Sequence, residues 1–431
     1  MIKLMENEKI NNIFLYLILF TLLYFGRDTL VLNSWIGIIP ASIIQVFILL
    51  ILSGNILIRI KQKKINLVYI KTRFFWCITV LLIIMLSMII NNAYTLMYFS
   101  ISFAILNAFV LSMYFNYDDF MYKFTNIMLF LIIFSFVSTY FLGIFIEAPT
   151  FKNIADFEFY NYVFCFDPTL EGYTRIFSIF REPGVYQIFL LIPLYFFLFQ
   201  KRSNLLKSDY FKIIVLVLGL ISTYSVTGWI AFIVLFVAWM IKIANYKKIM
   251  NFLKSNKKLS IGIVLLIIIF FILLFNFVYN NKSIYWMLYS MISKIKNIGT
   301  NDARVEAILY NIIMFIKSPF FGEDINVILG GVPHNTSSFL LMYSIFGIIG
   351  GIIFTLLYMK YCEIKFDGLK NSILSILITI IFFLLLNCEN ITTNIFLYAF
   401  PIIYYFSSDS KYVITNYENV KEKENENIVV Y

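Results

Sequence analysis

The stretch Leu259–Val278, with the sequence LSIGIVLLIIIFFILLFNFV, contains no charged residue and is almost entirely apolar. An α-helix needs about 20 such residues to cross the hydrocarbon core of a bilayer. The rest of the chain has the same character, because 61% of its 431 residues are hydrophobic and only 13% are charged. Soluble domains carry roughly 25% charged residues. The sequence therefore predicts an all-α fold, a polytopic integral membrane protein.

Eleven further apolar runs are long enough to be spans or shortened spans, so we expect about twelve transmembrane helices. The runs are Ile13–Phe25, Ile36–Ile58, Phe74–Ile90, Tyr94–Tyr114, Phe124–Ile146, Val185–Phe199, Phe211–Tyr224, Trp229–Ile241, Phe339–Met359, Ser372–Asn387 and Ile391–Phe406. They predict one transmembrane domain over residues 1–406. Residues 407–431 mix Lys, Glu and Asn, which predicts a disordered cytoplasmic tail.

The distribution of Lys and Arg predicts the orientation, because these residues favour the short cytoplasmic loops of membrane proteins. With twelve spans, all four loops rich in Lys and Arg fall on one side of the membrane. The alternate short connections Asn91–Ala93, Ser225–Gly228 and Cys388–Asn390 contain neither residue. Both termini are then cytoplasmic, and two long segments, about 147–184 and 279–338, lie outside. The loops account for the net charge of +10, so we expect no nucleic-acid partner.

The first long segment ends in YTRIFSIFREPG, Tyr173–Gly184, immediately before an apolar run. The guanidinium groups of Arg175 and Arg181 have the forked geometry that binds phosphate. Glu182 is placed to orient an arginine or to accept a proton from a hydroxyl. The alternatives are ordinary loop ion pairs and, for Glu182, a pairing with Arg181 or a favourable position at a helix N-terminus.

The second long segment predicts an amphipathic helix on the membrane surface, beginning after Asn301 or Asp302 and ending before Pro319. Arg304 lies in its first turn and is a third candidate for phosphate binding, although Asp302 and Glu306 could simply pair with it. Apolar residues recur along one face of this helix at Val305, Ile308, Leu309, Ile312, Ile313 and Ile316.

The only histidine, His334, follows a Gly-Gly-x-Pro turn and precedes a predicted span. An imidazole titrates near neutral pH, which suits proton transfer. His334 is the first candidate base and Glu182 the second. The alternative for His334 is a loop histidine that hydrogen-bonds to a carbonyl.

Several classes of site and function are disfavoured. No predicted span has a charged residue in its interior, which argues against an ion-coupled transporter. His334 has no second histidine or tight carboxylate pair beside it, and the four cysteines lack metal-site spacing, so neither a metal nor a cofactor is expected. A disulfide between Cys165 and Cys388 stays open, since both can face outward.

Three motifs resemble those of a known family. Arg175-x-x-Ser178-x-Phe180-x-Glu182-Pro183 resembles the R-x-x-G-x-F-x-E-P pattern of Wzy-type polysaccharide repeat-unit polymerases, with Ser178 where Gly is common. The stretch from Arg304 through Ser318-Pro319-Phe-Phe-Gly322 and His334-Asn335 to Phe346-Gly347-Ile-Ile-Gly350 is similar to the second outer loop of the O-antigen ligase and polymerase superfamily. Thr223–Gly228 resembles a short Ser-containing turn of the same enzymes, with Val226 where many relatives have Arg.

The resemblance implies a glycosyltransferase at the outer face of the bacterial cytoplasmic (inner) membrane. Such polymerases build O-antigen or capsule by transferring a growing glycan from undecaprenyl diphosphate to a hydroxyl of an incoming lipid-linked repeat unit. The related ligases are metal-independent and inverting. The implied partners are undecaprenyl-diphosphate-linked oligosaccharides and membrane lipids, with a chain-length regulator and a flippase as associated proteins.

Two other functions stay open beside polymerisation. An O-antigen ligase would use the same chemistry and transfer the glycan to lipid A core. A lipid-linked oligosaccharide flippase belongs to another class and would be expected to line a central cavity with charged residues, whereas the spans predicted here are uncharged.

Overall fold

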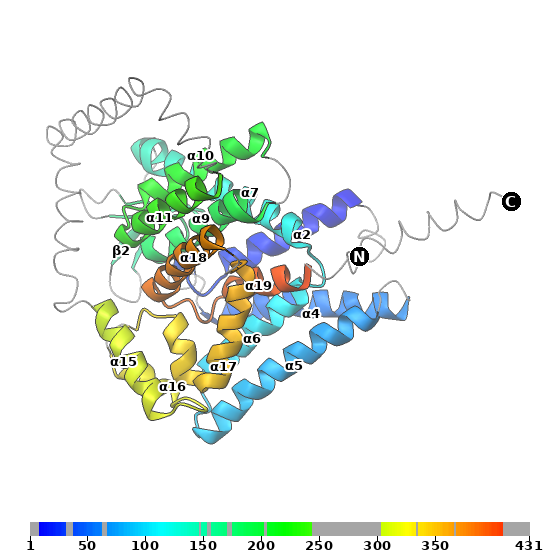
Figure 1. Cartoon of the computed structure of the whole chain (residues 1–431). Coiled ribbons are helices and arrows are strands. Elements are labelled where there is room, and N and C mark those ends of the chain that lie inside the picture. The colour runs from blue at the N-terminus through cyan, green and yellow to red at the C-terminus, as the bar shows by residue number, and fades with distance from the viewer. Residues whose placement is uncertain are drawn as a thin grey trace.

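The computed structural model describes residues 8–31, 38–62, 67–145, 148–152, 157–169, 175–201, 205–243, 303–332, 335–365 and 368–407. Most of these residues are helical (Figure 1). The helices are α2 (Glu8–Tyr24), α4 (Ile38–Lys61), α5 (Leu67–Ile90), α6 (Leu96–Leu111), α7 (Tyr117–Val137), α8 (Gly143–Phe145), α9 (Pro183–Tyr195), α10 (Lys207–Ser222), α11 (Val226–Ile243), α15 (Ala303–Lys317), α16 (Ile325–Gly330), α17 (Phe339–Tyr361), α18 (Leu369–Cys388) and α19 (Ile395–Ser407).

Within the described residues, six helical segments are long and apolar enough to cross a membrane. They are Ile70–Ile90, Tyr117–Leu142, Pro183–Gln200, Val226–Ile243, Phe339–Tyr361 and Leu369–Cys388. Four shorter apolar helices accompany them, in α2, α4, α6 and α19. The chain is therefore a mostly helical protein that carries several membrane-spanning helices. Twelve spans and the orientation of the chain remain predictions.

Each expected span coincides with a described helix except Leu259–Val278, which lies outside the described residues, as does the tail 408–431. Several helices are longer than expected at one end. Helix α5 begins at Leu67 and so includes Arg73, which we placed in the preceding loop; its side chain is 3% exposed. Helix α7 begins at Tyr117, and Lys123 in its second turn is buried and pairs with Asp119.

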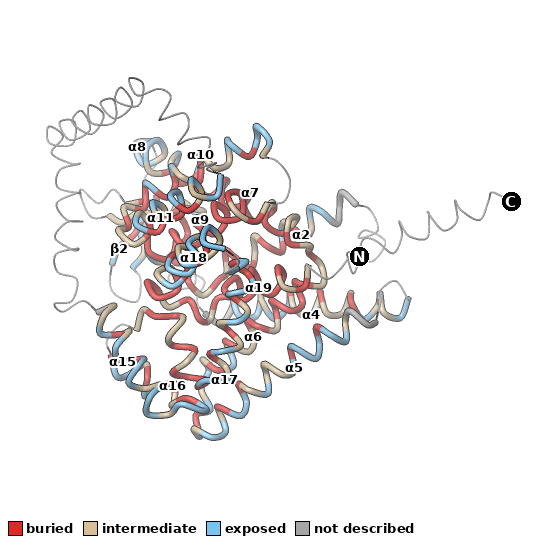
Figure 2. Tube along the Cα trace, in the orientation of Figure 1, coloured by how far each residue is buried: buried red, intermediate tan, exposed pale blue. Residues whose placement is uncertain are grey.

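Helix α9 lies at the centre of the bundle, and each of its residues is buried (Figure 2). A helix that is apolar on all sides must be surrounded by other helices. Pro183 occupies its first turn, where the missing N–H has no intrahelical partner to lose. The helix continues into the π-helical turn Phe196–Gln200 after Pro193, whose ring prevents a regular backbone hydrogen bond. The Arg181–Gly184 segment is thus attached to the most buried helix described.

The segment that follows α15 packs backbone to backbone against a kink in α17. Gly347 interrupts α17 with a φ of 63° and a ψ of −162°. A Cβ atom on Gly347 would lie 2.2 Å from the carbonyl oxygen of Phe320, and one on Gly322 would lie 2.2 Å from the carbonyl of Ile345. The amide of Ile348 donates to the carbonyl of Pro319 at 2.7 Å. Both glycines are therefore needed to hold α15 against α17.

Helix α15 confirms the helix predicted after Asp302, and its apolar face is turned away from the protein. Leu309, Ile313 and Ile316 are each more than half exposed, whereas Ala307 and Asn311 are fully buried. Figure 1 shows α15 and α16 at the edge of the bundle beside α17. An outward apolar face is the arrangement expected of a helix in contact with lipid.

The first long segment, which we predicted to lie outside, contains a small antiparallel sheet. Strands β1 (Thr150–Lys152), β2 (Glu158–Asn161) and β3 (Phe166–Pro168) pair in the order β1-β2-β3. The prediction missed them because strands of three or four residues are too short to show an alternating pattern.

Candidate functional site

The candidate site forms where the loop after α2, the segment before α9 and the loop between α18 and α19 meet. The amide of Arg181 donates to the carbonyl of Asp28 at 3.0 Å, and the amide of Leu30 donates to the carbonyl of Ile179 at 2.8 Å. Thr29 and Phe180 form the β-bridge between these two backbone bonds. The position of Arg181 is therefore fixed by its main chain before any side-chain contact is considered.

The Arg181 guanidinium connects all three segments. Its Nη2 atom lies 3.7 Å from Oδ1 of Asp28 and donates to the carbonyl of Asn390 at 3.0 Å. Its Nε atom is buried without a hydrogen-bond partner among the described residues, while the side chain as a whole is 31% exposed. Burial alone would lower the pKa of Arg181, but the carboxylates of Asp28, Glu182 and Glu389 outweigh it and raise the pKa. The guanidinium stays charged and keeps donor capacity for an anion.

Asp28 is the buried counter-charge, and the sequence interpretation did not include it in the site. Its side chain is almost inaccessible, and Oδ2 accepts a hydrogen bond from Nδ2 of Asn394 at 2.9 Å. Burial raises its pKa, while Arg181 and the amide of Asn394 act in the opposite direction. Asp28 interacts electrostatically with its neighbour Arg27 and also with Arg181, a residue 153 positions away.

Glu389 is a second carboxyl group that the sequence did not identify. Its side chain is 5% exposed, and Oε1 lies 3.5 Å from Nη2 of Arg304. It also packs over the first turn of α9, where a Cβ atom on Gly184 would lie 2.1 Å from Oε1. Burial and the nearby charge of Glu182 raise the pKa of Glu389 to about 7, although Arg304 and Arg181 oppose the shift. Glu389 therefore titrates in the neutral range.

Arg304 brings the second long segment to the same carboxyl group. It lies in the first turn of α15, as predicted, and its Nη2 atom contacts Oε1 of Glu389; Asp302, a partner that we considered for it, lies outside the described residues. Two of the three candidate arginines thus reach one cluster from different parts of the chain. We name Asp28, Arg181, Arg304 and Glu389 the charge cluster.

Arg175 lies apart from the charge cluster. Its Nε donates to the carbonyl of Thr223 at 3.1 Å, and the amide of Ile176 donates to the carbonyl of Ser222 at 3.0 Å. Arg175 is half-buried at the turn between α10 and α11, the turn that resembles a family motif. This hydrogen bond connects the Arg175–Pro183 stretch to the Thr223–Gly228 turn, and it places Arg175 beside that turn rather than beside Glu389.

Glu182 is the exposed carboxylate of the site. It is the N-cap residue of α9, but its side chain makes no capping hydrogen bond. Glu182 therefore occupies the helix N-terminus that the alternative expected, without a capping hydrogen bond. Its carboxylate is close enough to raise the pKa values of both Arg181 and Glu389.

Ser178 stands where the pattern that this stretch resembles has Gly, and its backbone conformation is one that suits Gly. Its backbone φ is 55°, in the left-handed region that glycine adopts without steric cost. Its hydroxyl donates to the carbonyl of Phe164 at 3.2 Å, and the residue is fully buried. Glycine is thus the residue expected at this position, and Ser178 accepts a strained backbone while it gains one buried hydrogen bond.

His334 lies outside the described residues, but the residues that follow it are tied to the site. Asn335 exchanges amide hydrogen bonds with Asn311 of α15 at 2.9 and 3.2 Å. The hydroxyl of Ser338 donates to the carbonyl of Glu389 at 2.7 Å and accepts from the amide of Ile391 at 2.8 Å. The start of α17 is therefore held against the loop that carries Glu389.

Within the described ranges, no group of three or more His, Cys, Asp or Glu side chains could hold a metal ion. All four cysteines are buried and free, so a disulfide between Cys165 and Cys388 does not form. The Cys388 thiol instead accepts a hydrogen bond from Nε2 of Gln187 at 3.3 Å.

No protein-family model, curated protein or solved structure matches this chain. The chemistry of the site must therefore be argued from its own geometry. The site holds two guanidinium groups and two buried carboxyl groups, and burial raises the pKa of one carboxyl group, Glu389, to about 7. An external anion can therefore take the place of Glu389 beside Arg304.

Proposed function

We propose that the protein is a membrane glycosyltransferase that polymerises oligosaccharide repeat units carried on undecaprenyl diphosphate. The observation that carries the proposal is that Arg181 and Arg304, from two distant segments, both contact the connection between α18 and α19: Arg181 donates to the carbonyl of Asn390, and Arg304 lies 3.5 Å from the buried carboxyl group of Glu389. Paired guanidinium groups at the end of an apolar helical bundle suit a diphosphate attached to a lipid.

In the proposed reaction a hydroxyl oxygen of the acceptor glycan attacks the anomeric carbon of the donor glycan. The bond between that carbon and the diphosphate oxygen breaks, and the lipid diphosphate leaves with the electron pair. Negative charge accumulates on the leaving group, and cations fixed beforehand at that position lower the barrier. We assign this role to Arg181 and Arg304, with Arg175 binding more distant parts of the substrate near the Thr223 turn.

The hydroxyl proton requires an acceptor. His334 and the exposed carboxylate of Glu182 remain the candidate bases. Glu389 is too buried to meet a hydroxyl directly. It acts as a positioning residue: it holds Arg304 in the free enzyme and releases it when the diphosphate arrives. An added negative charge raises the pKa of a neighbouring carboxyl group, so Glu389 takes up a proton at that moment.

The test is a gel of surface polysaccharide from a strain that lacks this chain and has no redundant copy, together with its lipid-linked intermediates. Single repeat units that still reach the surface support a polymerase. Full polymer on undecaprenyl diphosphate, with none on the final acceptor, means a ligase. Single units trapped inside the cell mean a flippase. An unchanged ladder refutes all three.

A further inference from the structure

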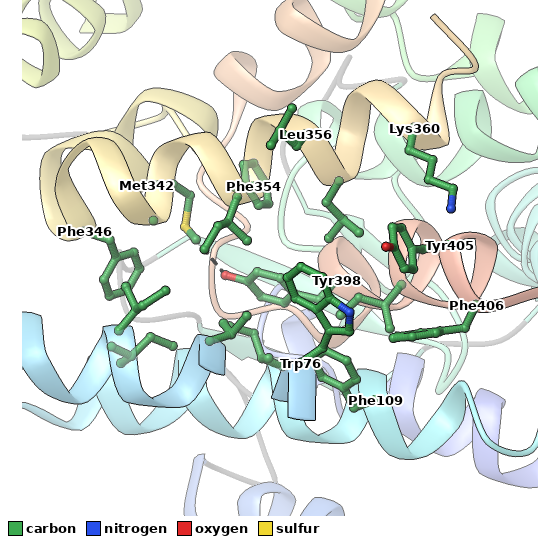
Figure 3. Close-up of a pocket in the computed structure, with 18 residues that line it drawn as sticks. Trp76, Phe109, Met342, Phe346, Phe354, Leu356, Lys360, Tyr398, Tyr405 and Phe406 are labelled. Atoms are coloured by element: carbon green, nitrogen blue, oxygen red, sulfur yellow. Dashed lines mark hydrogen bonds between the residues drawn. The ribbon is translucent and has the colours of Figure 1, made fainter. Parts of the chain in front are cut away.

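A second candidate binding site, which shares no residue with the charge cluster, is an apolar groove between α5 and α17. The groove has a volume of about 290 Å³, and its floor is formed by α6 and α19. Trp76 and Val80 line it from α5, Phe109 from α6, and Phe354 from α17. Figure 3 shows these side chains facing a common space, with Phe346 and Met342 at one end and Lys360 and Tyr405 at the other.

Side-chain hydrogen bonds join α5 to the neighbouring segments at one end of the groove. At the Phe346 end, the hydroxyl of Ser87 in α5 donates to the carbonyls of Ile345 and Phe321 at 2.7 and 2.8 Å. At the opposite end, Trp76 packs edge-on against Tyr405 of α19. The groove therefore lies where α5 and α17 are no longer joined by hydrogen bonds.

The Lys360 end of the groove is cationic. The Nζ atom of Lys360 lies 3.7 Å from the centroid of the Tyr405 ring, and the side chain is exposed. Among the described residues no carboxylate lies within ion-pair distance of this ammonium. Arg73 adds a second charge at this end, with its guanidinium carbon 4.8 Å from the centroid of Phe406, which also lines the groove.

The dimensions of the groove fit one leaflet of a bilayer. Beyond the kink at Gly347, the lining residues of α17 run from Gly350 to Lys360. Ten residues of helix rise about 15 Å, which is half of the roughly 30 Å hydrocarbon core. A hydrocarbon chain in the groove would thus begin at the interface beside Lys360 and end near the membrane midplane.

We propose that this groove binds an anionic phospholipid, with one acyl chain between α5 and α17 and its phosphate against the Lys360 ammonium. The charge at the Lys360 end complements an anionic headgroup, and the uncharged aromatic lining complements an acyl chain. This inference does not rest on the proposed transferase reaction.

The test measures lipid binding to the purified, delipidated full chain by native mass spectrometry. The probes are palmitoyl-oleoyl phosphatidylglycerol and phosphatidylcholine, which share their chains and differ in charge. The variants are Lys360→Gln, which removes the headgroup contact, and Val80→Trp, which fills the groove. Lys365→Gln is the matched control, because Lys365 is an exposed lysine of the same interface that does not line the groove.

We expect Lys360→Gln to weaken phosphatidylglycerol binding about fivefold, the effect of one cation at an anionic lipid surface. The control should stay within about twofold of the wild type, and Val80→Trp should lose the tightest bound lipid of either kind. Equal binding of the two lipids by the wild type, or unchanged binding in Lys360→Gln, overturns the proposal. Displacement of phosphatidylglycerol by an equimolar amount of undecaprenyl phosphate also overturns it and assigns the groove to a polyprenyl chain. Because Lys360 is exposed, its variant decides the matter even if Val80→Trp does not fold.

Discussion

Replacing Glu389 by Gln should abolish the proton uptake that accompanies binding of a lipid-linked diphosphate. In the free protein Glu389 pairs with Arg304, and burial raises its pKa to about 7. When the diphosphate takes over Arg304, the carboxylate loses a cation and gains an anionic neighbour. Both changes favour the protonated acid. Glutamine keeps the shape of the side chain but cannot bind the proton.

The size of the effect follows from the pKa of about 7. At pH about 7.5 such a group is roughly one quarter protonated. A unit negative charge ~8 Å away, at an effective dielectric constant of ~20, raises the pKa by about 1.5 units. The group then becomes roughly nine-tenths protonated. The wild type should therefore take up about two thirds of a proton for each diphosphate bound, and Glu389→Gln should take up none.

Isothermal titration calorimetry in buffers of different ionisation enthalpy, such as Hepes and Tris, measures this uptake directly. The ligand is a glycan diphosphate lipid, in which each phosphorus carries a single acidic proton that is lost well below neutral pH, so the ligand itself does not titrate. Glu158→Gln, which removes an exposed carboxylate of strand β2 away from the charge cluster, is the control and should retain the uptake. Uptake that survives in Glu389→Gln but disappears in His334→Ala would refute the reasoning and assign the proton to the histidine.

Three further predictions concern the stability and folding of the protein. Because the pKa of Glu389 is raised in the folded state, its contribution to stability is complete below about pH 4.5 and is lost as the pH rises to about 7. This shift in pKa corresponds to about 3 kcal/mol of unfolding free energy. Thermal unfolding of Glu389→Gln should lack this part of the pH dependence. Gly347→Ala should destabilise the protein by more than ~1 kcal/mol, because a Cβ atom would lie 2.2 Å from the Phe320 carbonyl oxygen. The control Gly54→Ala, with open space around it, should be neutral or stabilising by up to ~1 kcal/mol. Equal melting temperatures of the two variants in detergent would contradict the packing described. Ser178→Gly should fold normally and Ser178→Val should not, since a φ of 55° excludes a β-branched side chain; similar yields of both variants would show that the backbone there differs.

Helix positions could be predicted from the sequence because a membrane span leaves a long, uncharged apolar run. The same pattern placed Arg304 in the first turn of α15 and identified Arg181 beside α9. The ends of the helices could not be predicted as well, because helices α5 and α7 continue past their apolar runs into residues such as Arg73 and Lys123. Arg73 packs against the ring of Phe406, and Lys123 pairs with Asp119. The sequence alone does not distinguish such a buried cation from a charged residue in an exposed loop.

The carboxyl half of the charge cluster could not be predicted from the sequence. Asp28 and Glu389 each lie in a short connection with no motif around them, and they become site residues only because three distant segments meet. One signal was present but was not interpreted: Gly184 follows Pro183 at the start of a buried helix, and a glycine there indicates close approach by another group. The approaching group is Glu389.

The most direct test of the central claim is polymer synthesis by purified protein supplied with undecaprenyl-diphosphate-linked repeat units. The account predicts that Arg181→Ala and Arg304→Ala each lower the rate at least ~100-fold, the cost of removing a cation from developing negative charge. Lys152→Ala, which removes an exposed cation from the first long segment, should leave the rate unchanged. Polymer synthesis at the wild-type rate by a folded Arg181→Ala variant would contradict the account.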